Sequence, residues 1–220
     1  MEITIISPYS NRPDFMEIQH KTLKKHIKNN FKWLILNNAY YDKELFNEIE
    51  KNCKKLGAKS FPIEHDESKY GDKNDYASVI GSNTINYAWK NKLSKLEGII
   101  FLLDCDMFFI GDLDIERLME NTELVYVPVY TNNKEWTWPC CMLLSNLQNS
   151  NEIDFGFYPI DGQHCDSGSA MYCYLQKYKP KVKHFERNAI LDEQNELLEF
   201  LDFPHPYSID YLKFDNKPIV

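Results

Sequence analysis

The chain has 220 residues, 43% of them hydrophobic and 14% aromatic, which is enough for one large α/β domain and argues against intrinsic disorder. Its formal net charge of −8 disfavours non-specific binding to nucleic acid, which needs Lys and Arg to displace counterions. No apolar run approaches the length of a membrane span, and the apolar start of the chain indicates a first strand instead of a signal peptide.

The first half of the chain alternates short apolar runs with helical periodicity. The apolar runs predict strands at residues 3–7, 31–36, 59–63 and 99–103. The periodic stretches predict helices at residues 15–29, 43–56 and 76–93, the second capped by Asp42 and stopped by Gly57. Strands joined through helices form parallel sheets with right-handed crossovers. We therefore expect the α/β class, with a Rossmann-like, mostly parallel sheet flanked by helices.

The second half is more irregular. Its pattern predicts strands at residues 124–130, 136–144 and 182–185, the second a candidate for antiparallel pairing, with a helix over 166–178 and a weak helix over 191–201. Residues 203–220 form a Pro- and aromatic-rich tail. Because no linker or repeat separates the halves, we expect a single domain over residues 1–220.

The cysteines carry no metal-binding pattern. None of the six belongs to a CxxC pair. With no signal peptide ahead of them, we expect reduced thiols in a cytoplasmic protein, and zinc ligation by some of them stays a minor alternative.

The most informative feature is a pair of acids, Asp104 and Asp106, at the end of the apolar run 99–103. Two carboxylates in such a place are costly unless a positive charge meets them. Carboxylates together with substrate phosphates are the usual ligands of Mg²⁺ and Mn²⁺. In an extended chain, residues two apart point to the same side, so both acids could face one ion, or one of them could do so through water. Ligands of open α/β sheets also bind beyond the carboxyl ends of the strands.

Two other interpretations of the acid pair remain. The strand could simply end in solvent with both acids exposed, although the apolar residues on either side argue against this. The first acid could be the nucleophile of a phosphatase, but such a motif usually lies near the N-terminus and is followed by Thr or Val where this chain has Phe108. Metal binding is the favoured interpretation.

On these residues the chain resembles glycosyltransferases of the GT-A fold. In that family a DxD motif after an apolar strand binds a divalent metal and the diphosphate of a nucleotide sugar, and Asp104-Cys105-Asp106 matches the motif in its preceding strand and its distance from the N-terminus. The opening Ile5-Ile6-Ser7-Pro8-Tyr9 and the short length are similar to small members encoded by large DNA viruses. The resemblance implies a nucleotide-sugar-binding half over residues 1–110 and an acceptor-side half over 111–220.

The resemblance also implies residues around the nucleotide. The loop after the first strand would embrace the nucleoside, with Pro8, Tyr9 and Arg12 in that place: Tyr9 could stack on the base and Arg12 could reach a phosphate. Asp75 and Tyr76, at the start of the helix before the acid pair, would lie near the ribose. A plain surface loop is the alternative interpretation of residues 8–14.

A polar loop at residues 161–169 is the candidate for the catalytic base. Inverting members of the family carry an acid downstream of the DxD motif that takes the acceptor's proton, and such a base must lie within hydrogen-bond reach of the attacking oxygen. Asp166 is the first choice and Asp161 the second. Asp166 could also be no more than a helix N-cap, and retention stays open because inversion rests on this residue.

A histidine would complete the metal site by the same resemblance. His184 is the candidate and His205 its rival, although a lone His is more often structural. Lys183 and Arg187 could neutralise the leaving diphosphate, or could simply be solvated. The implied cofactor is Mn²⁺ or Mg²⁺, the donor a UDP- or GDP-linked sugar, and the acceptor a hydroxyl of a glycan or other molecule.

Two rival functions share the sheet and the acid pair. A sugar nucleotidyltransferase usually opens with a Gly-rich loop, and residues 8–12 contain no glycine. A sugar- or nucleotide-binding module with a degenerate site would bind such ligands without turnover. Metal-dependent binding of UDP or GDP with slow donor hydrolysis distinguishes the transferase from the binding module.

Overall fold

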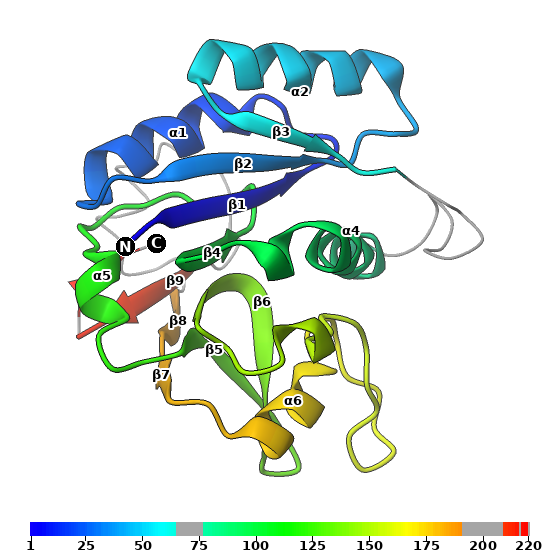
Figure 1. Cartoon of the computed structure of the whole chain (residues 1–220), viewed down its shortest axis with the longest axis vertical. Coiled ribbons are helices and arrows are strands. Elements are labelled where there is room, and N and C mark those ends of the chain that lie inside the picture. Colours follow the sequence, from blue (N-terminus) through cyan, green and yellow to red (C-terminus); the bar gives the residue numbers. More distant parts are fainter. Residues whose placement is uncertain (65–76, 191–208, 216, 220) are drawn as a thin grey trace.

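The computed structural model describes residues 1–64, 77–190, 209–215 and 217–219. Its main sheet has seven strands in the order β3-β2-β1-β4-β6-β5-β7 (Figure 1). The strands are β1 (Ile3–Tyr9), β2 (Lys32–Asn37), β3 (Lys59–Pro62), β4 (Ile99–Leu103), β5 (Leu124–Thr131), β6 (Lys134–Ser145) and β7 (Val182–His184). Every neighbouring pair is parallel except those of β6, which runs antiparallel to both β4 and β5. The mostly parallel sheet and the antiparallel strand expected near residues 136–144 are thus confirmed.

Helices cover both faces of the sheet. They are α1 (Phe15–His26), α2 (Lys43–Leu56), α4 (Ala77–Asn91), α5 (Ile115–Leu118) and α6 (Met171–Tyr178), with short 3₁₀ turns at Leu93–Lys95 and Ser150–Glu152. In Figure 1, α1 and α2 lie on one side of the sheet and α4 and α6 on the other. Among the described residues no helix is both long and apolar enough to cross a bilayer.

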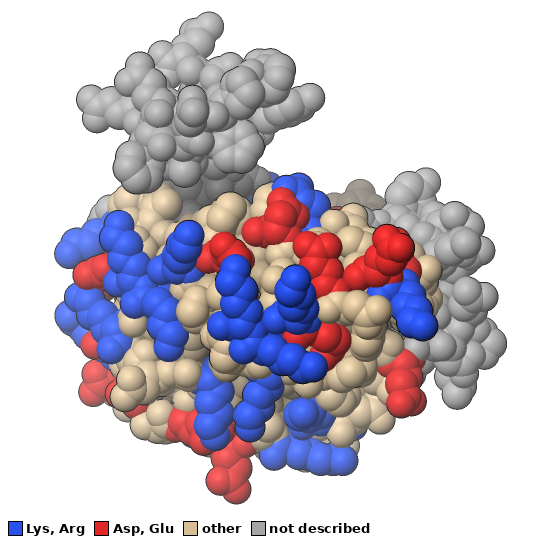
Figure 2. Space-filling model, turned by 90° about the horizontal axis from the view of Figure 1, so that it is seen from above, with Lys and Arg blue, Asp and Glu red and all other residues tan. Residues whose placement is uncertain are grey.

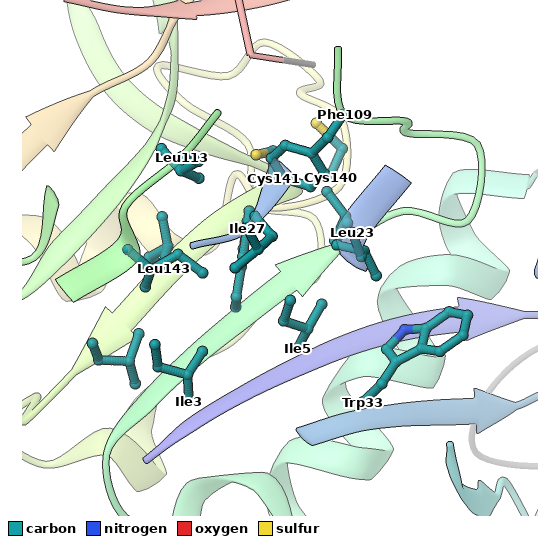
Figure 3. Packing of buried hydrophobic residues seen from close by; sticks show 14 of the residues in the cluster. Ile3, Ile5, Leu23, Ile27, Trp33, Phe109, Leu113, Cys140, Cys141 and Leu143 are labelled. Carbon is teal, nitrogen blue, oxygen red and sulfur yellow. The ribbon is translucent and has the colours of Figure 1, made fainter. Parts of the chain in front are cut away.

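Two apolar clusters, one on each face, bury the sheet. Alternate residues of a strand point to opposite faces, so Ile5 of β1 belongs to one cluster and Ile6 to the other. Figure 3 shows the first cluster, in which Leu23 of α1 and Ile27, which follows the helix, pack against the sheet. All five residues of β4 are buried, as expected for the central strand of a sheet covered on both faces.

Local signals in the sequence explain where α2 begins and ends. The Asp42 carboxylate accepts hydrogen bonds from the backbone N–H groups of Glu44 and Leu45, which have no partner within the helix. Gly57 follows the last turn with a φ of 71°, in the left-handed region that glycine adopts without strain. The predicted helix at residues 43–56 is therefore confirmed to the residue.

A second, three-stranded sheet is the main difference from the sequence-based expectation. It joins β8 (Glu186–Ile190), β9 (Ile209–Phe214) and β10 (Lys217–Pro218) in the order β10-β9-β8. Part of the expected tail thus forms strands, and the buried side chains of Leu212 and Ile219 join the core cluster that α1 covers. The weak helix expected at residues 191–201 lies outside the described residues.

One glycine lets the end of the chain approach the segment after β4. The backbone N–H of Ile110 donates to the carbonyl of Ile219 at 3.0 Å. A Cβ atom on Gly111 would lie 2.1 Å from the carbonyl oxygen of Pro218, far inside van der Waals contact. A side chain at position 111 would therefore force β10 away from this segment.

Candidate functional site

The acid pair lies where the order of the strands reverses. From β1 the chain proceeds outward to β2 and β3, then returns through α4 to β4 on the other side of β1. The carboxyl ends of β1 and β4 are therefore adjacent, and a ligand crevice in an open α/β sheet is expected at this position. Tyr9 ends β1 there, and Asp104 follows β4 directly.

The motif itself forms a tight turn instead of continuing the strand. The backbone N–H of Met107 donates to the carbonyl of Asp104 at 3.2 Å, and the N–H of Asp104 donates to the carbonyl of Cys140 on β6 at 2.8 Å. The expected extended chain is thus replaced by the turn 104–107. The two carboxylates remain close enough to interact, and the negative charge of Asp106 therefore helps to raise the pKa of Asp104.

A fully buried glutamine on α1 fixes this turn. The Gln19 Nε2 group donates to the carbonyl oxygens of Asp104 at 2.7 Å and Met107 at 3.0 Å. Its Oε1 accepts the hydroxyl hydrogen of Tyr9 at 3.0 Å. Sequence reasoning missed Gln19, although a signal exists: this amide stands among the apolar core positions of α1, between Met16 and Leu23.

The Tyr9 ring has a structural place in the same network. Its side chain is completely buried, and its hydroxyl lies 3.4 Å from the carbonyl oxygen of Cys105. The buried ring leaves no face for a nucleobase, so Tyr9 supports the acidic turn from below instead of stacking on a base. Pro8 also lies within β1, paired with Leu36, so the strand continues two residues further than expected.

The electrostatics of the turn leave a negative charge without a partner. Burial, and secondarily the charge of Asp106, raise the pKa of Asp104 to about 7. Among the described residues no ion pair joins Asp104 or Asp106 to a cationic side chain. Burial raises the pKa of the intervening Cys105 thiol to about 12, so this thiol is protonated at neutral pH. The donor set is therefore two carboxylates, one half-buried and one exposed, and it suits a hard divalent cation.

Arg12 lies beside the acidic turn. Its guanidinium forms two hydrogen bonds with Asp14, at 3.0 and 2.7 Å, and stands 3.5 Å from the centre of the Phe15 ring. The hydrogen bond with Asp14 raises the pKa of Arg12, and the charge of Asp106 adds to the effect. The side chain is exposed, so it can reach a ligand at the turn by exchanging its Asp14 partner.

The loop carrying Asp166 packs against the strand next to β4. Gly168 has a φ of 87°, and a Cβ there would lie 2.2 Å from the carbonyl oxygen of Thr137 on β6. This contact places residues 166–168 beside the part of β6 that precedes Cys140. Asp166 is exposed, and its carboxylate accepts the Ser167 N–H at 2.7 Å. The helix expected from residue 166 begins only at Met171, so Asp166 is not its N-cap.

Asp161 lies on the loop that precedes α6 and contacts the start of β6. Its carboxylate forms an ion pair with Lys134, whose ammonium group also stands 5.9 Å from the centre of the Tyr172 ring. One oxygen of Asp161 is thus already engaged. Within the described residues neither Asp161 nor Asp166 forms a hydrogen bond or ion pair with the acidic turn, and the Asp166 carboxylate has no cationic partner there.

His184 is not brought together with the acid pair. It ends β7, three strands from β4, which corresponds to about 14 Å across the sheet. Its Nε2 lies 3.1 Å from Glu135 Oε1, and its ring packs edge-on against Tyr126. No group of three or more His, Cys, Asp or Glu in the described part of the chain could hold a metal ion. The rival ligand His205, and Asp75 and Tyr76, which are expected near the ribose, lie outside the described residues.

Arg187 is the second cation near the turn. Its guanidinium stands 4.5 Å from the centre of the Trp138 ring. Burial raises the pKa of the Cys140 thiol, and the positive charge of Arg187 partly opposes this rise. Cys140 in turn accepts the Asp104 N–H through its carbonyl. Lys183 lies elsewhere, because its ammonium group donates to the carbonyl of Leu118 at 2.7 Å.

One cavity lies away from the acid pair. It has a volume of about 700 Å³ and is lined by residues such as Glu116, Asn121 and Lys181 at the amino ends of the central strands. None of its lining residues belongs to the acidic turn. The chemistry of the turn, and not the size of the cavity, therefore locates the candidate site.

No protein-family model matches the chain, and no curated protein matches it either. Solved structures do match. Residues 1–349 of TarS from S. aureus align with 84% of this chain and 58% of that structure, at 16% identity and a TM-score of 0.50. PcManGT, a mannosyltransferase from Pyrobaculum calidifontis solved with GDP-Man and Mn²⁺, aligns with 83% of this chain and 54% of that structure, at 9% identity and a TM-score of 0.52.

These matches establish the fold. The α/β architecture with a mostly parallel seven-stranded sheet flanked by helices is that of GT-A glycosyltransferases, as the sequence predicted. The chain spans just over half the length of both matched structures.

Proposed function

We propose that the protein is a metal-dependent glycosyltransferase that moves a sugar from a nucleotide diphosphate sugar to an acceptor hydroxyl. The observation that carries the proposal is the unpaired acid couple Asp104 and Asp106 at the point where the strand order reverses. Neither carboxylate has a cationic partner among the described residues, and a buried charge without one is costly. The likeness to a mannosyltransferase that binds GDP-Man and Mn²⁺ supports the same interpretation.

Asp104 and Asp106 are the residues that would hold Mn²⁺ or Mg²⁺. Such an ion takes one or two carboxylates and completes its oxygen ligands with water and substrate phosphates, so a third protein ligand is not required. When bound, it supplies Lewis-acid stabilisation of the charge on the departing diphosphate. Gln19 and Tyr9 hold the turn in place, which keeps both carboxylates at the carboxyl ends of β1 and β4.

Two arginines favour a diphosphate at this position. Arg12 on the loop after β1 and Arg187 on β8 approach the acidic turn from different elements. A planar guanidinium binds phosphate oxygens in pairs, and its contact with an aromatic ring, Phe15 or Trp138, orients it. Both are proposed to orient the diphosphate, whether the donor carries UDP or GDP.

Asp166 is the proposed base of an inverting reaction. Its exposed carboxylate lies on a loop packed against β6, one strand from Asp104. It would take the proton of the acceptor hydroxyl while the acceptor oxygen bonds to the anomeric carbon and the nucleoside diphosphate departs. Asp161 is the second candidate, and its ion pair with Lys134 makes it less available. The half over residues 111–220 is accordingly proposed to face the acceptor.

The test is release of nucleoside diphosphate from a panel of nucleotide sugars, with Mn²⁺ and with a chelator. Asp106→Asn should lower metal-dependent turnover by about a hundredfold or more, because one of two carboxylate ligands is lost. Asp112→Asn is the matched control, since Asp112 pairs with His26 and Lys28 on the surface. Full turnover in the Asp106 variant would overturn the proposal.

The base is tested separately. Asp166→Asn should lower kcat by about 100- to 10,000-fold while metal-dependent binding of UDP or GDP stays unchanged. If Asp161→Asn gives that result and Asp166→Asn does not, the base is Asp161. A wild-type protein that binds nucleotide and never turns over any donor is a binding module, and one that condenses a sugar phosphate with a nucleoside triphosphate is a nucleotidyltransferase.

A further inference from the structure

The charge of this acidic chain is unevenly distributed. Residues 15–28 and 51–59 together contain eight lysines and one acidic residue, Glu17. The rest of the chain therefore holds 17 of the 25 Lys and Arg against 32 of the 33 Asp and Glu. A protein with a net charge of −8 thus concentrates positive charge in two short segments.

The fold brings these two segments together on one surface. Lys55 of α2 forms an ion pair with Glu17 of α1, and Asn52 Nδ2 donates to the carbonyl of Pro13 at 3.1 Å. The last turns of α2 therefore lie beside the first turns of α1. We call the exposed lysines of these two segments, residues 15–28 and 51–59, the lysine face: Lys21, Lys24, Lys25, Lys28, Lys51, Lys54, Lys55 and Lys59.

Helical spacing aligns the charges on α1. Lys21, Lys24 and Lys25 lie three or four residues apart and so project from one side of the helix, opposite the buried Met16 and Leu23. Lys28 follows the end of α1. Figure 2 looks onto α1 and α2 and shows Lys and Arg spread over much of this surface, with some acidic side chains between them.

Several of these charges form no ion pair in the part of the chain that the structure describes. Only Lys28 and Lys55 of the lysine face form ion pairs among the described residues, with Asp112 and Glu17 respectively. Like charges gathered in this way repel one another, and an opposing negative surface removes the repulsion.

The composition of the face favours a lipid headgroup surface over a nucleic acid. Proteins that bind single strands stack bases on aromatic rings and arginine planes. The described residues of both segments include no arginine and no exposed aromatic side chain. Clusters of four to eight basic residues on a helix surface are instead the usual signature of binding to anionic lipids. Ile18, 48% exposed beside the lysines of α1, adds an apolar contact.

We infer that the lysine face docks the protein on an anionic bilayer. The face is formed by α1, the last turns of α2 and the residues that follow each helix, whereas the acid pair lies at the carboxyl ends of β1 and β4. Docking therefore leaves the candidate site open, and it does not depend on the proposed reaction.

The inference is tested by co-sedimentation with vesicles of phosphatidylcholine, with and without phosphatidylglycerol. The wild-type protein should sediment only with the anionic vesicles, and less so as salt is raised, because exposed charges are screened. Changing Lys21, Lys25, Lys51 and Lys54 to Glu should lower the partition coefficient by about a hundredfold or more, at about fivefold for each lysine.

A matched control distinguishes an effect of the lysine face from an effect of net charge alone. Changing Lys90, Lys95, Lys179 and Lys181 to Glu gives the same net charge, but these exposed lysines lie around α4 and α6 on the other side of the sheet. This variant should sediment like the wild type. Equal loss in both variants, no sedimentation of the wild type, or stronger binding to RNA than to anionic vesicles at the same salt would overturn the inference.

Discussion

At the scale of single residues, the candidate site depends on a buried hydrogen-bond network that touches no ligand. Gln19 joins the hydroxyl of Tyr9 to the carbonyls of Asp104 and Met107, and both Tyr9 and Gln19 are completely buried. Buried polar groups cost little while they are paired and much when one partner is removed. The network therefore couples the stability of the fold to the geometry of the acidic turn.

Gln19→Leu should destabilise the protein by about 2–4 kcal/mol, because it removes the three hydrogen bonds that the buried amide of Gln19 makes to Tyr9, Asp104 and Met107. Tyr9→Phe keeps the ring and removes only the hydroxyl, so about 1 kcal/mol is expected. Urea unfolding measures both. Equal stability of Gln19→Leu and the wild type would show that the turn 104–107 does not depend on this network.

Asp104 should impose a pH dependence on the metal-free protein. Its pKa is raised from 3.8 to about 7, so its contribution to stability is complete below pH 3.8 and is lost as pH rises through about 7. Asp104→Asn removes this loss. The variant should thus gain stability relative to the wild type between pH 4 and pH 8, by at most about 4 kcal/mol, as followed by thermal unfolding. A difference that stays constant with pH would contradict the assignment of the shift to Asp104.

At the scale of elements, sequence patterns predicted what depends on local signals. Apolar runs and caps gave the first half of the sheet and the limits of α2, because Asp42 and Gly57 act within a few residues of their own positions. The second sheet was not predicted. Its strands β8 and β9 lie far apart in the chain, and β10 depends on the close approach of Pro218 to Gly111. Such pairing is specified by tertiary contacts between residues distant in the sequence, so the pattern of a short stretch of residues does not reveal it.

The same distinction applies to the candidate site. The acid pair follows an apolar strand and can be recognised in the sequence. The turn that it forms is held by Gln19, which lies on a helix about 85 residues earlier in the chain. The place of His184 beside Glu135 depends on the register between β5 and β7, which the sequence does not reveal. Residue types at strand ends can therefore be predicted, and their mutual distances cannot.

Two glycine substitutions test the account of the second sheet. Gly111→Ala should be destabilising, because the new Cβ would lie 2.1 Å from the carbonyl oxygen of Pro218. Gly81→Ala is the matched control: it lies in α4 with nothing within 4 Å, so it should stabilise the protein by about 0.5–1 kcal/mol. Thermal unfolding shows whether each substitution raises or lowers the stability. If Gly111→Ala leaves the stability unchanged, β10 is not held at this position.

At the scale of the whole molecule, different surfaces carry different chemistry. The carboxyl ends of β1 and β4 present two acids that form no ion pair within the described residues, with two arginines nearby, and α1 with the last turns of α2 presents lysines. The central sheet separates α1 and α2 from α4 and α6, so the lysine face and its control set on the other side can be altered independently. Additivity is expected for such distant sites.

The most direct test of the central claim is the anomalous diffraction of crystals grown with Mn²⁺ and UDP or GDP. The account predicts an anomalous peak at the acidic turn, within about 2–2.5 Å of oxygens from both Asp104 and Asp106 and in contact with the diphosphate. A map with bound nucleotide and no manganese between these carboxylates, or with the ion held elsewhere, would contradict it.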